Sequence, residues 1–203
     1  MRQLKSRTRA LAEAPARFLG RLGFSPNGLT IAGALLTASV GLLVAQSWFL
    51  AAGICLWLFS ATDTLDGALA RATNRVSVFV AFLDSVCDRY AEAAVFFGLV
   101  WWYQSTGNPL GVALAYLALV GSLMVSYTRA RAEGVGLQAA EVGWFQRPER
   151  IAALGVGLIL APFVPGILLV VLALLTVLTT VTVLQRVVHV ARVSRYNQPH
   201  TTP

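Results

Sequence analysis

Four aspartates lie close together in a chain that is otherwise apolar: Asp63, Asp66, Asp84 and Asp88. They account for four of the nine acidic residues among the 203 of the chain. On two antiparallel helices joined near Asn74, Asp63 and Asp84 would lie at similar depth, about 15 Å from the turn. The i, i+3 spacing of the first pair and the i, i+4 spacing of the second place each pair on one helical face. The spacing therefore allows the four carboxylates to converge in one cavity.

Carboxylates gathered in an apolar setting repel one another and need a positive partner. Oxygen ligands in this number suit Mg²⁺ or Mn²⁺, so we favour a binuclear metal site. The alternative is a set of salt bridges, in which Arg71, Arg75 and Arg89 neutralise three acids and leave one over. Gly67 and Ala70 share the face of the first two aspartates and leave room for a ligand, although small residues also serve close helix packing in membranes.

The composition indicates a membrane protein. The chain is 57% hydrophobic and 12% charged, whereas soluble domains are about 25% charged. Residues 29–50, 110–125 and 166–184 carry no charge, and the longer two of these runs can span a hydrocarbon core of ~30 Å. We predict an all-α integral membrane protein made of a single domain, without internal repeats. The predicted spans are residues 28–46, 49–72, 76–102, 109–132, 148–164 and 166–190.

The distribution of charge predicts the orientation of these spans. The first, third and fifth connections are uncharged, whereas every basic residue except Arg89 lies near a terminus or an even-numbered connection. The positive-inside rule then places both termini on the cytoplasmic side of the cell membrane. Residues 1–25 are basic, have apolar residues at helical spacing and lack the apolar core of a signal peptide, so we expect an interfacial amphipathic helix. The net charge of +7 favours anionic lipid head groups as partners, and we expect no nucleic acid.

The segment "DTLDGALAR", followed by "DSVCD", resembles the signature of the CDP-alcohol phosphotransferases, D-x2-D-G-x2-A-R-x8-G-x3-D-x3-D. Seven of the eight fixed positions match, and Val80 stands where the signature has its second glycine. The predicted spans and the segment 25–30, "SPNGLT", extend the resemblance across the chain. Val80 could narrow the nucleotide cavity. It is also the reason to keep a non-catalytic membrane scaffold with a retained metal site as an alternative.

The resemblance implies an enzyme that transfers the phosphatidyl group of CDP-diacylglycerol to an alcohol and releases CMP. Two metal ions, Mg²⁺ or Mn²⁺, would be held by the aspartates of the signature, and Asp88 would also act as general base on the attacking hydroxyl. The resemblance further implies a homodimer among membrane lipids. The residues implied in binding the CDP-lipid are Gly67, Ala70 and Arg71, with Asn27, Thr30 and Ser77 as weaker candidates.

A cluster of arginines bears on the identity of the alcohol. Arg129, Arg131, Arg147 and Arg150 flank one connection on the side of the aspartates. Arginine binds phosphate through paired hydrogen bonds, which favours a phosphorylated acceptor, although ordinary positive-inside charge explains part of the cluster. The strings "SYTRARAE" and "RPER" resemble segments of bacterial phosphatidylinositol-phosphate synthases. This resemblance implies inositol phosphate as acceptor, bound by Arg129, Arg131 and Arg150 and joined by Arg186. Glycerol 3-phosphate is the alternative acceptor.

Overall fold

The computed structural model describes residues 25–60, 77–137 and 142–196, and all regular structure in these ranges is helical. A proline opens two of the helices directly after an N-cap side chain, Ser25 before Pro26 and Asn108 before Pro109, as is common where a helix begins. The described helices are α2 (Pro26–Ala45), α3 (Phe49–Ser60), α5 (Val78–Ser105), α6 (Pro109–Gly134), α7 (Arg147–Leu160) and α8 (Ile167–Tyr196).

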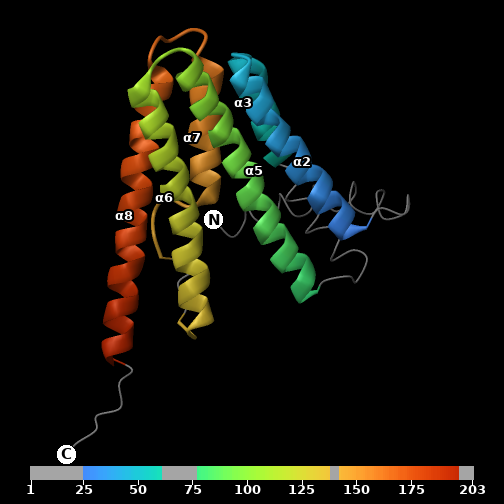
Figure 1. Ribbon diagram of the computed structural model, residues 1–203. Coiled ribbons are helices and arrows are strands. Elements are labelled where there is room, and N and C mark those ends of the chain that lie inside the picture. The colour runs from blue at the N-terminus through green and yellow to red at the C-terminus, as the bar shows by residue number, and fades with distance from the viewer. Residues whose placement is uncertain (1–24, 61–76, 138–141, 197–203) are drawn as a thin grey trace, which may run out of the picture.

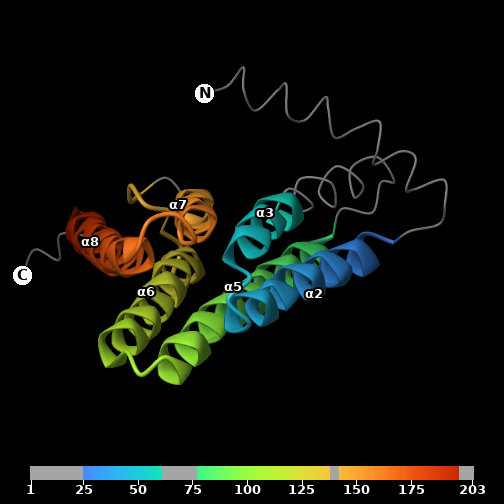
Figure 2. The same ribbon diagram turned by 90° about the horizontal axis from the view of Figure 1, so that it is seen from above.

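The helices form a bundle of neighbouring pairs. Helix α2 packs along α5, α5 packs against α6, and α6 packs against α8, while α7 contacts α3 and α8 (Figure 1). Seen from above, α6, α7 and α8 form one group, and α2, α3 and α5 form the other (Figure 2). Large apolar side chains, among them Leu56, Phe96, Leu158 and Leu172, fill the core. The two groups of helices therefore share one apolar core.

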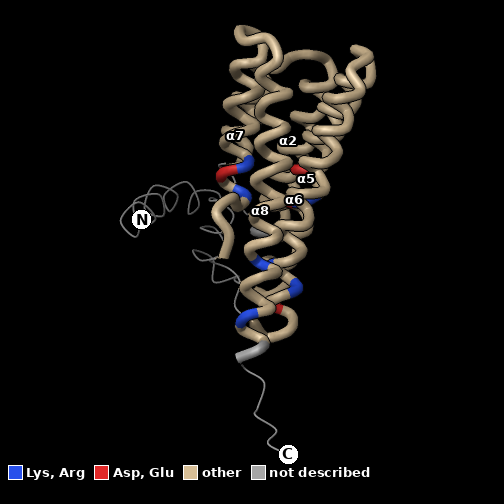
Figure 3. Tube along the Cα trace, turned by 90° about the vertical axis from the view of Figure 1, so that its left-hand side faces the viewer, with Lys and Arg blue, Asp and Glu red and all other residues tan. Residues whose placement is uncertain are grey.

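The two ends of the bundle differ in charge. The connections at 46–48, 106–108 and 161–166 carry no charged residue, and all three lie at the end shown uppermost in Figure 1. The charged residues of the described helices lie from the middle of the bundle to the opposite end (Figure 3). Toward that end α5 diverges from α6. The charged half of the bundle is thus the half in which a polar site can form.

Three described helices are long and apolar enough to cross a membrane, over Asn27–Ala45, Pro109–Gly134 and Ile167–Ser194. Large apolar side chains such as Leu35 and Phe97 are more than 60% exposed, as expected for surfaces that face lipid. These findings confirm an all-helical membrane protein. The count of six spans stays a prediction, because α3 and α7 have 12 and 14 residues and α5 carries four charged residues between Asp84 and Glu92. The predicted interfacial helix, residues 1–25, lies almost entirely outside the described residues.

Within the described residues, the helix bounds differ from the predicted spans by four residues or more at two places. Helix α7 ends at Leu160, whereas the prediction continues to residue 164, because Pro162 cannot continue the backbone hydrogen bonding of a helix. Helix α8 extends to Tyr196, six residues beyond the predicted end at residue 190. The apolar pattern stops near Val190, but the basic and polar residues that follow are compatible with a helix that leaves the hydrocarbon core. Cys55 and Cys87 are unpaired.

Two glycines allow α2 and α5 to cross closely. A Cβ atom added at Gly98 would overlap the carbonyl oxygen of Gly41, and one added at Gly41 would overlap the carbonyl oxygen of Ala94. Small residues at helix crossings permit this kind of backbone approach in membranes. The crossing matters for function because α5 carries Asp84 and Asp88.

We expect Gly98→Ala to lower the stability of the detergent-solubilised protein by about 1–3 kcal/mol, the usual cost of overpacking. Gly134→Ala is the matched control, since nothing lies within 4 Å of a Cβ atom at that helical glycine. Thermal unfolding of both variants checks the expectation. Equal melting temperatures for the two variants would show that the crossing tolerates a methyl group.

Candidate active site

Helix α5 supplies the two signature aspartates that the structure describes. The helix begins after Ser77, whose Oγ accepts a hydrogen bond of 3.1 Å from the backbone N–H of Val80. Asp84 and Asp88 follow one turn apart on one face, and both are partly buried. Val80 lies in the first turn of α5 and is partly buried as well. The predicted sharing of a face by the two aspartates is therefore confirmed.

Asp88 is held by an arginine from another helix. Its Oδ1 lies 2.8 Å from Nη2 of Arg147, the first residue of α7. Arg89 lies farther away, with 3.8 Å between its Nη1 and Oδ2 of Asp88, and it donates to the carbonyl of Ser85 on its own helix. The salt-bridge alternative named Arg89 as a partner. In this structure the closer partner is Arg147, which we had placed with the acceptor phosphate.

A second ion pair lies one turn farther along α5 and was missed in the sequence. Glu92 accepts two hydrogen bonds from Arg150, at 2.9 Å from Nε and 3.0 Å from Nη2. The exposed fractions are 3% for Glu92 and 1% for Arg150. A carboxylate four residues after Asp88, inside an apolar stretch, was the signal that could have drawn attention to Glu92.

Arg150 keeps unused donors after this pairing. Within the described part of the chain, its Nη1 is buried and has no hydrogen-bond partner. A buried charged donor without a partner is costly, so such a group in a folded protein calls for an explanation. A bound anion would provide the missing acceptor.

Arg186 of α8 is also buried, at 2% exposure. Its guanidinium group donates to the backbone carbonyls of Val125 and Val142 and lies within electrostatic range of Arg129 and Arg150. These contacts attach the segment before α7 to both α6 and α8. Arg186 therefore fixes the local backbone as well as adding positive charge.

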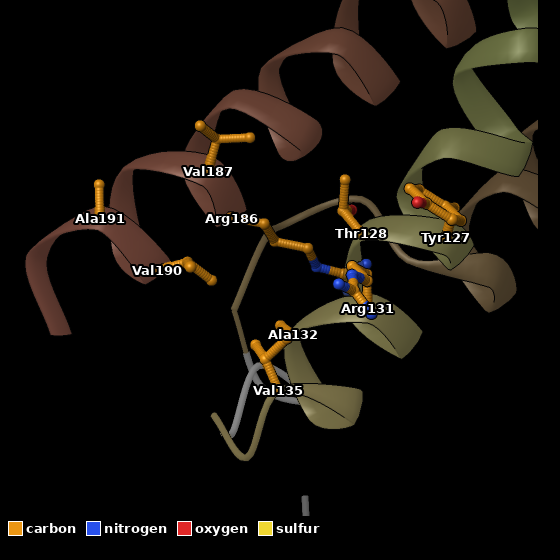
Figure 4. Close-up of a pocket in the computed structure, with 9 residues that line it drawn as sticks. All are labelled: Tyr127, Thr128, Arg131, Ala132, Val135, Arg186, Val187, Val190 and Ala191. Carbon is orange, nitrogen blue, oxygen red and sulfur yellow. The ribbon is translucent and has the colours of Figure 1, made fainter. Parts of the chain in front are cut away.

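The two arginines near the end of α6 point in different directions. Arg129 pairs with Glu133 at 3.0 Å, whereas Arg131 lines a cavity of about 340 Å³ between α6 and α8. Figure 4 shows Arg131 reaching from α6, and Arg186 from α8, toward this mainly aliphatic space. Residues two positions apart lie about 200° apart around a helix, so Arg129 and Arg131 cannot both point into one small site.

Some of the remaining site candidates lie in the described residues, and the others lie outside them. Asn27, in the first turn of α2, has a buried Oδ1 without a hydrogen-bond partner among the described residues, and Thr30 is buried one turn later. Ser77 is exposed and serves as the N-cap of α5. The candidates that lie outside the described residues are Asp63, Asp66, Gly67, Ala70 and Arg71.

The donor set fits a hard divalent cation. Asp84 and Asp88 contribute carboxylate oxygens from one face of α5, and Mg²⁺ and Mn²⁺ prefer such ligands. Among the described residues no group of three or more His, Cys, Asp or Glu side chains could hold a metal ion. A complete site would therefore need Asp63 and Asp66 as well.

Comparison with known proteins identifies the family of this chain. The family model described as CDP-alcohol phosphatidyltransferase matches residues 24–194. Phosphatidylinositol phosphate synthase of Mycobacterium tuberculosis is 41% identical over 155 residues, which cover 74% of this chain and 70% of the relative. Archaetidylinositol phosphate synthase of Pyrococcus horikoshii is 37% identical over 172 residues, covering 83% and 87%.

Solved structures of the mycobacterial synthase have the same fold as this chain. The crystal structure with CDP-DAG bound gives a TM-score of 0.84 at 33% identity, covering 96% of this chain and 98% of that one. The complex with manganese and citrate gives a TM-score of 0.84 at 34% identity, covering 95% and 92%. Since the family model spans most of the sequence, this chain belongs to the CDP-alcohol phosphatidyltransferase family.

Proposed function

We propose that this enzyme transfers the phosphatidyl group of CDP-diacylglycerol to a hydroxyl group of inositol phosphate and releases CMP. One observation carries the proposal: a candidate base, Asp88, contacts Arg147 in the first turn of α7, and Arg150 lies in the same turn. Arg147 contacts Asp88 at 2.8 Å, and Arg150 retains a buried donor. A base next to phosphate-binding groups suits an acceptor that carries both a hydroxyl and a phosphate.

The reaction needs one proton transfer and one displacement. The hydroxyl oxygen of the acceptor attacks the phosphorus that bears diacylglycerol, and a new P–O bond forms. The P–O bond to the CMP phosphate breaks, and CMP leaves with the electron pair. Asp88 takes the proton of the attacking hydroxyl as general base. Arg147 keeps this carboxylate in place through their ion pair.

Divalent metal ions fit the charge of the substrate. Two ions held by Asp63, Asp66, Asp84 and Asp88 would neutralise the diphosphate of the CDP-lipid and stabilise the leaving CMP. The mycobacterial relative was crystallised with manganese, which supports Mn²⁺ or Mg²⁺ here. Other groups are proposed to hold the CDP portion, namely Gly67, Ala70, Arg71, Asn27, Thr30 and Ser77.

The acceptor is assigned from the arginines and from the relatives. Arg147 and Arg150 supply guanidinium groups near Asp88, and Arg186 lies within electrostatic range of both Arg150 and Arg129. Two named relatives are synthases of an inositol phosphate lipid, which favours inositol phosphate over glycerol 3-phosphate. We further propose a homodimer in the cell membrane, with the charged half of the bundle, the termini and the active site on the cytoplasmic side, as the positive-inside rule requires.

Removal of metal tests the proposal. Excess chelator should abolish CMP release from CDP-diacylglycerol and inositol phosphate, and added Mg²⁺ or Mn²⁺ should restore it, because the diphosphate would otherwise face unscreened carboxylates. Chromatographic quantification of CMP measures the reaction. Release that continues unchanged in chelator would contradict the metal-dependent mechanism, and a lack of release with every acceptor would support a scaffold.

A further inference from the structure

We infer that Glu92 is a positioning residue for the acceptor phosphate, which it serves through Arg150. This inference rests on the proposed function, since it concerns the same phosphate-bearing acceptor. In the proposed reaction, Glu92 touches neither the base nor the substrate. Its carboxylate contacts Arg150, whose Nη1 is buried and has no hydrogen-bond partner in the described part of the chain.

The pairing leaves one edge of the guanidinium group available. A guanidinium group has five N–H donors, one on Nε and two on each terminal nitrogen. Glu92 accepts from Nε and from Nη2 at 2.9 and 3.0 Å, and thereby occupies the edge formed by these two atoms. Three hydrogens remain, two on Nη1 and one on Nη2. One hydrogen of each of these nitrogens points along the second edge, and the other hydrogen of Nη1 points toward Cδ. That edge matches two oxygens of a phosphate.

The location of Arg150 would be unfavourable without Glu92. Arg147 and Arg150 both lie in the first turn of α7, where the positive end of the helix dipole disfavours cations. Arg150 is also almost fully buried and lies near the positive charge of Arg186. The carboxylate of Glu92 offsets these costs, so the guanidinium group can stay charged, buried and in one orientation.

The spacing links this arginine to the candidate base. Asp88 and Glu92 are one turn apart on α5, and they face Arg147 and Arg150, which are one turn apart on α7. The Gln146–Glu149 capping box, in which the backbone N–H of Gln146 donates to Glu149 over 3.1 Å, holds the first turn of α7. Two ion pairs between the same two helices therefore set the position of Arg150 relative to Asp88. A phosphate bound to Arg150 would be held at a defined distance from the base.

Kinetics of Glu92 variants test the inference in the full-length, metal-loaded enzyme. We expect Glu92→Gln to raise the KM for inositol phosphate at least ~10-fold, as for other lost hydrogen bonds to charged groups. The KM for CDP-diacylglycerol should stay within about twofold, because a metal-bound diphosphate does not depend on Arg150. Glu149→Gln is the matched control: Glu149 lies in the same turn as Arg150, is exposed, and glutamine can also complete a capping box.

A double variant separates positioning from an independent effect. If Glu92 acts through Arg150, the double variant Glu92→Gln/Arg150→Gln should be no slower in kcat/KM than Arg150→Gln alone. Additive losses in kcat/KM would overturn the inference. A folded Glu92→Gln enzyme with an unchanged KM for inositol phosphate would also overturn it, because a purely structural ion pair would affect only stability. Size-exclusion chromatography and binding of CDP-diacylglycerol establish folding. Glu92→Asp keeps the negative charge and is used if Glu92→Gln does not fold. We expect its KM for inositol phosphate to lie between those of the wild type and Arg150→Gln.

A separate binding experiment distinguishes failure of this inference from failure of the proposed function. Calorimetry with inositol phosphate, and separately with glycerol 3-phosphate, requires no turnover. Preference of the wild type for glycerol 3-phosphate would refute the proposed acceptor, and weaker binding of that ligand by Glu92→Gln would still support the positioning role. Equal binding of either ligand by wild type and Glu92→Gln would overturn the positioning role alone. Failure of the wild type to bind either ligand would overturn both.

Discussion

Asp88→Asn should lower kcat for CMP release by about 10²–10⁴-fold, the range expected when general acid–base catalysis is lost. Asparagine has nearly the same shape as aspartate but cannot take the proton of the attacking hydroxyl. It also weakens the contact with Arg147, which lies 2.8 Å from the carboxylate. Binding of CDP-diacylglycerol should suffer less than turnover, because three other aspartates of the signature remain for the metal ions.

Steady-state CMP release and equilibrium binding of the CDP-lipid measure these two effects separately. Glu149→Gln is again the matched control, since it makes the same change from acid to amide at an exposed position. Near-normal turnover in Asp88→Asn would assign the base to another residue. A loss of lipid binding as large as the loss of turnover would instead assign Asp88 to substrate binding alone.

Arg129→Gln should reduce kcat/KM for inositol phosphate by about 10- to 100-fold, since hydrogen bonds to charged groups contribute roughly 1.5–3 kcal/mol. Arg129 is within electrostatic range of Arg186, which is itself within electrostatic range of Arg150. Arg131→Gln should have a smaller effect, because Arg131 lies about 200° from Arg129 around α6.

The pair of variants is informative because both remove one arginine from the same turn of α6. Arg192→Gln is the control for a general loss of positive charge, since Arg192 lies on another surface of α8, beside His189. Equal effects of all three replacements on KM would indicate nonspecific electrostatics. A larger effect at Arg131 than at Arg129 would move the acceptor site into the cavity shown in Figure 4.

Much of the helical architecture could be predicted because apolar runs and turn residues report local structure. Pro26, Asn108 and Pro109 mark helix starts where the structure has them, and the uncharged connections predicted which helix ends lie together. The end of α7 was harder to place, because Phe163 and Val164 continue the apolar pattern past Pro162 while the backbone cannot.

The candidate site could be predicted only where its residues lie on one helix. The i, i+4 spacing of Asp84 and Asp88 fixes their shared face whatever the helix packs against. The Glu92–Arg150 pair joins residues 58 positions apart. Local sequence patterns do not predict which helix faces pack against each other, so this pair could not be predicted. Arg147 was grouped with the acceptor arginines for its charge, and only the approach of α7 to α5 shows its contact with Asp88. Arg129 and Arg131 were predicted to bind one phosphate together, whereas in the structure Arg129 pairs with Glu133 and Arg131 lines the cavity between α6 and α8.

A competition between acceptors tests the proposed reaction most directly. Purified protein is given CDP-diacylglycerol, Mg²⁺ and equal concentrations of inositol phosphate, glycerol 3-phosphate and free inositol, and the lipid products are quantified by mass spectrometry. Our account predicts that the product derived from inositol phosphate dominates, because the arginines bind its phosphate and hold its hydroxyl near Asp88. Predominance of the product from free inositol would contradict the account, since the guanidinium groups would then have no phosphate to bind.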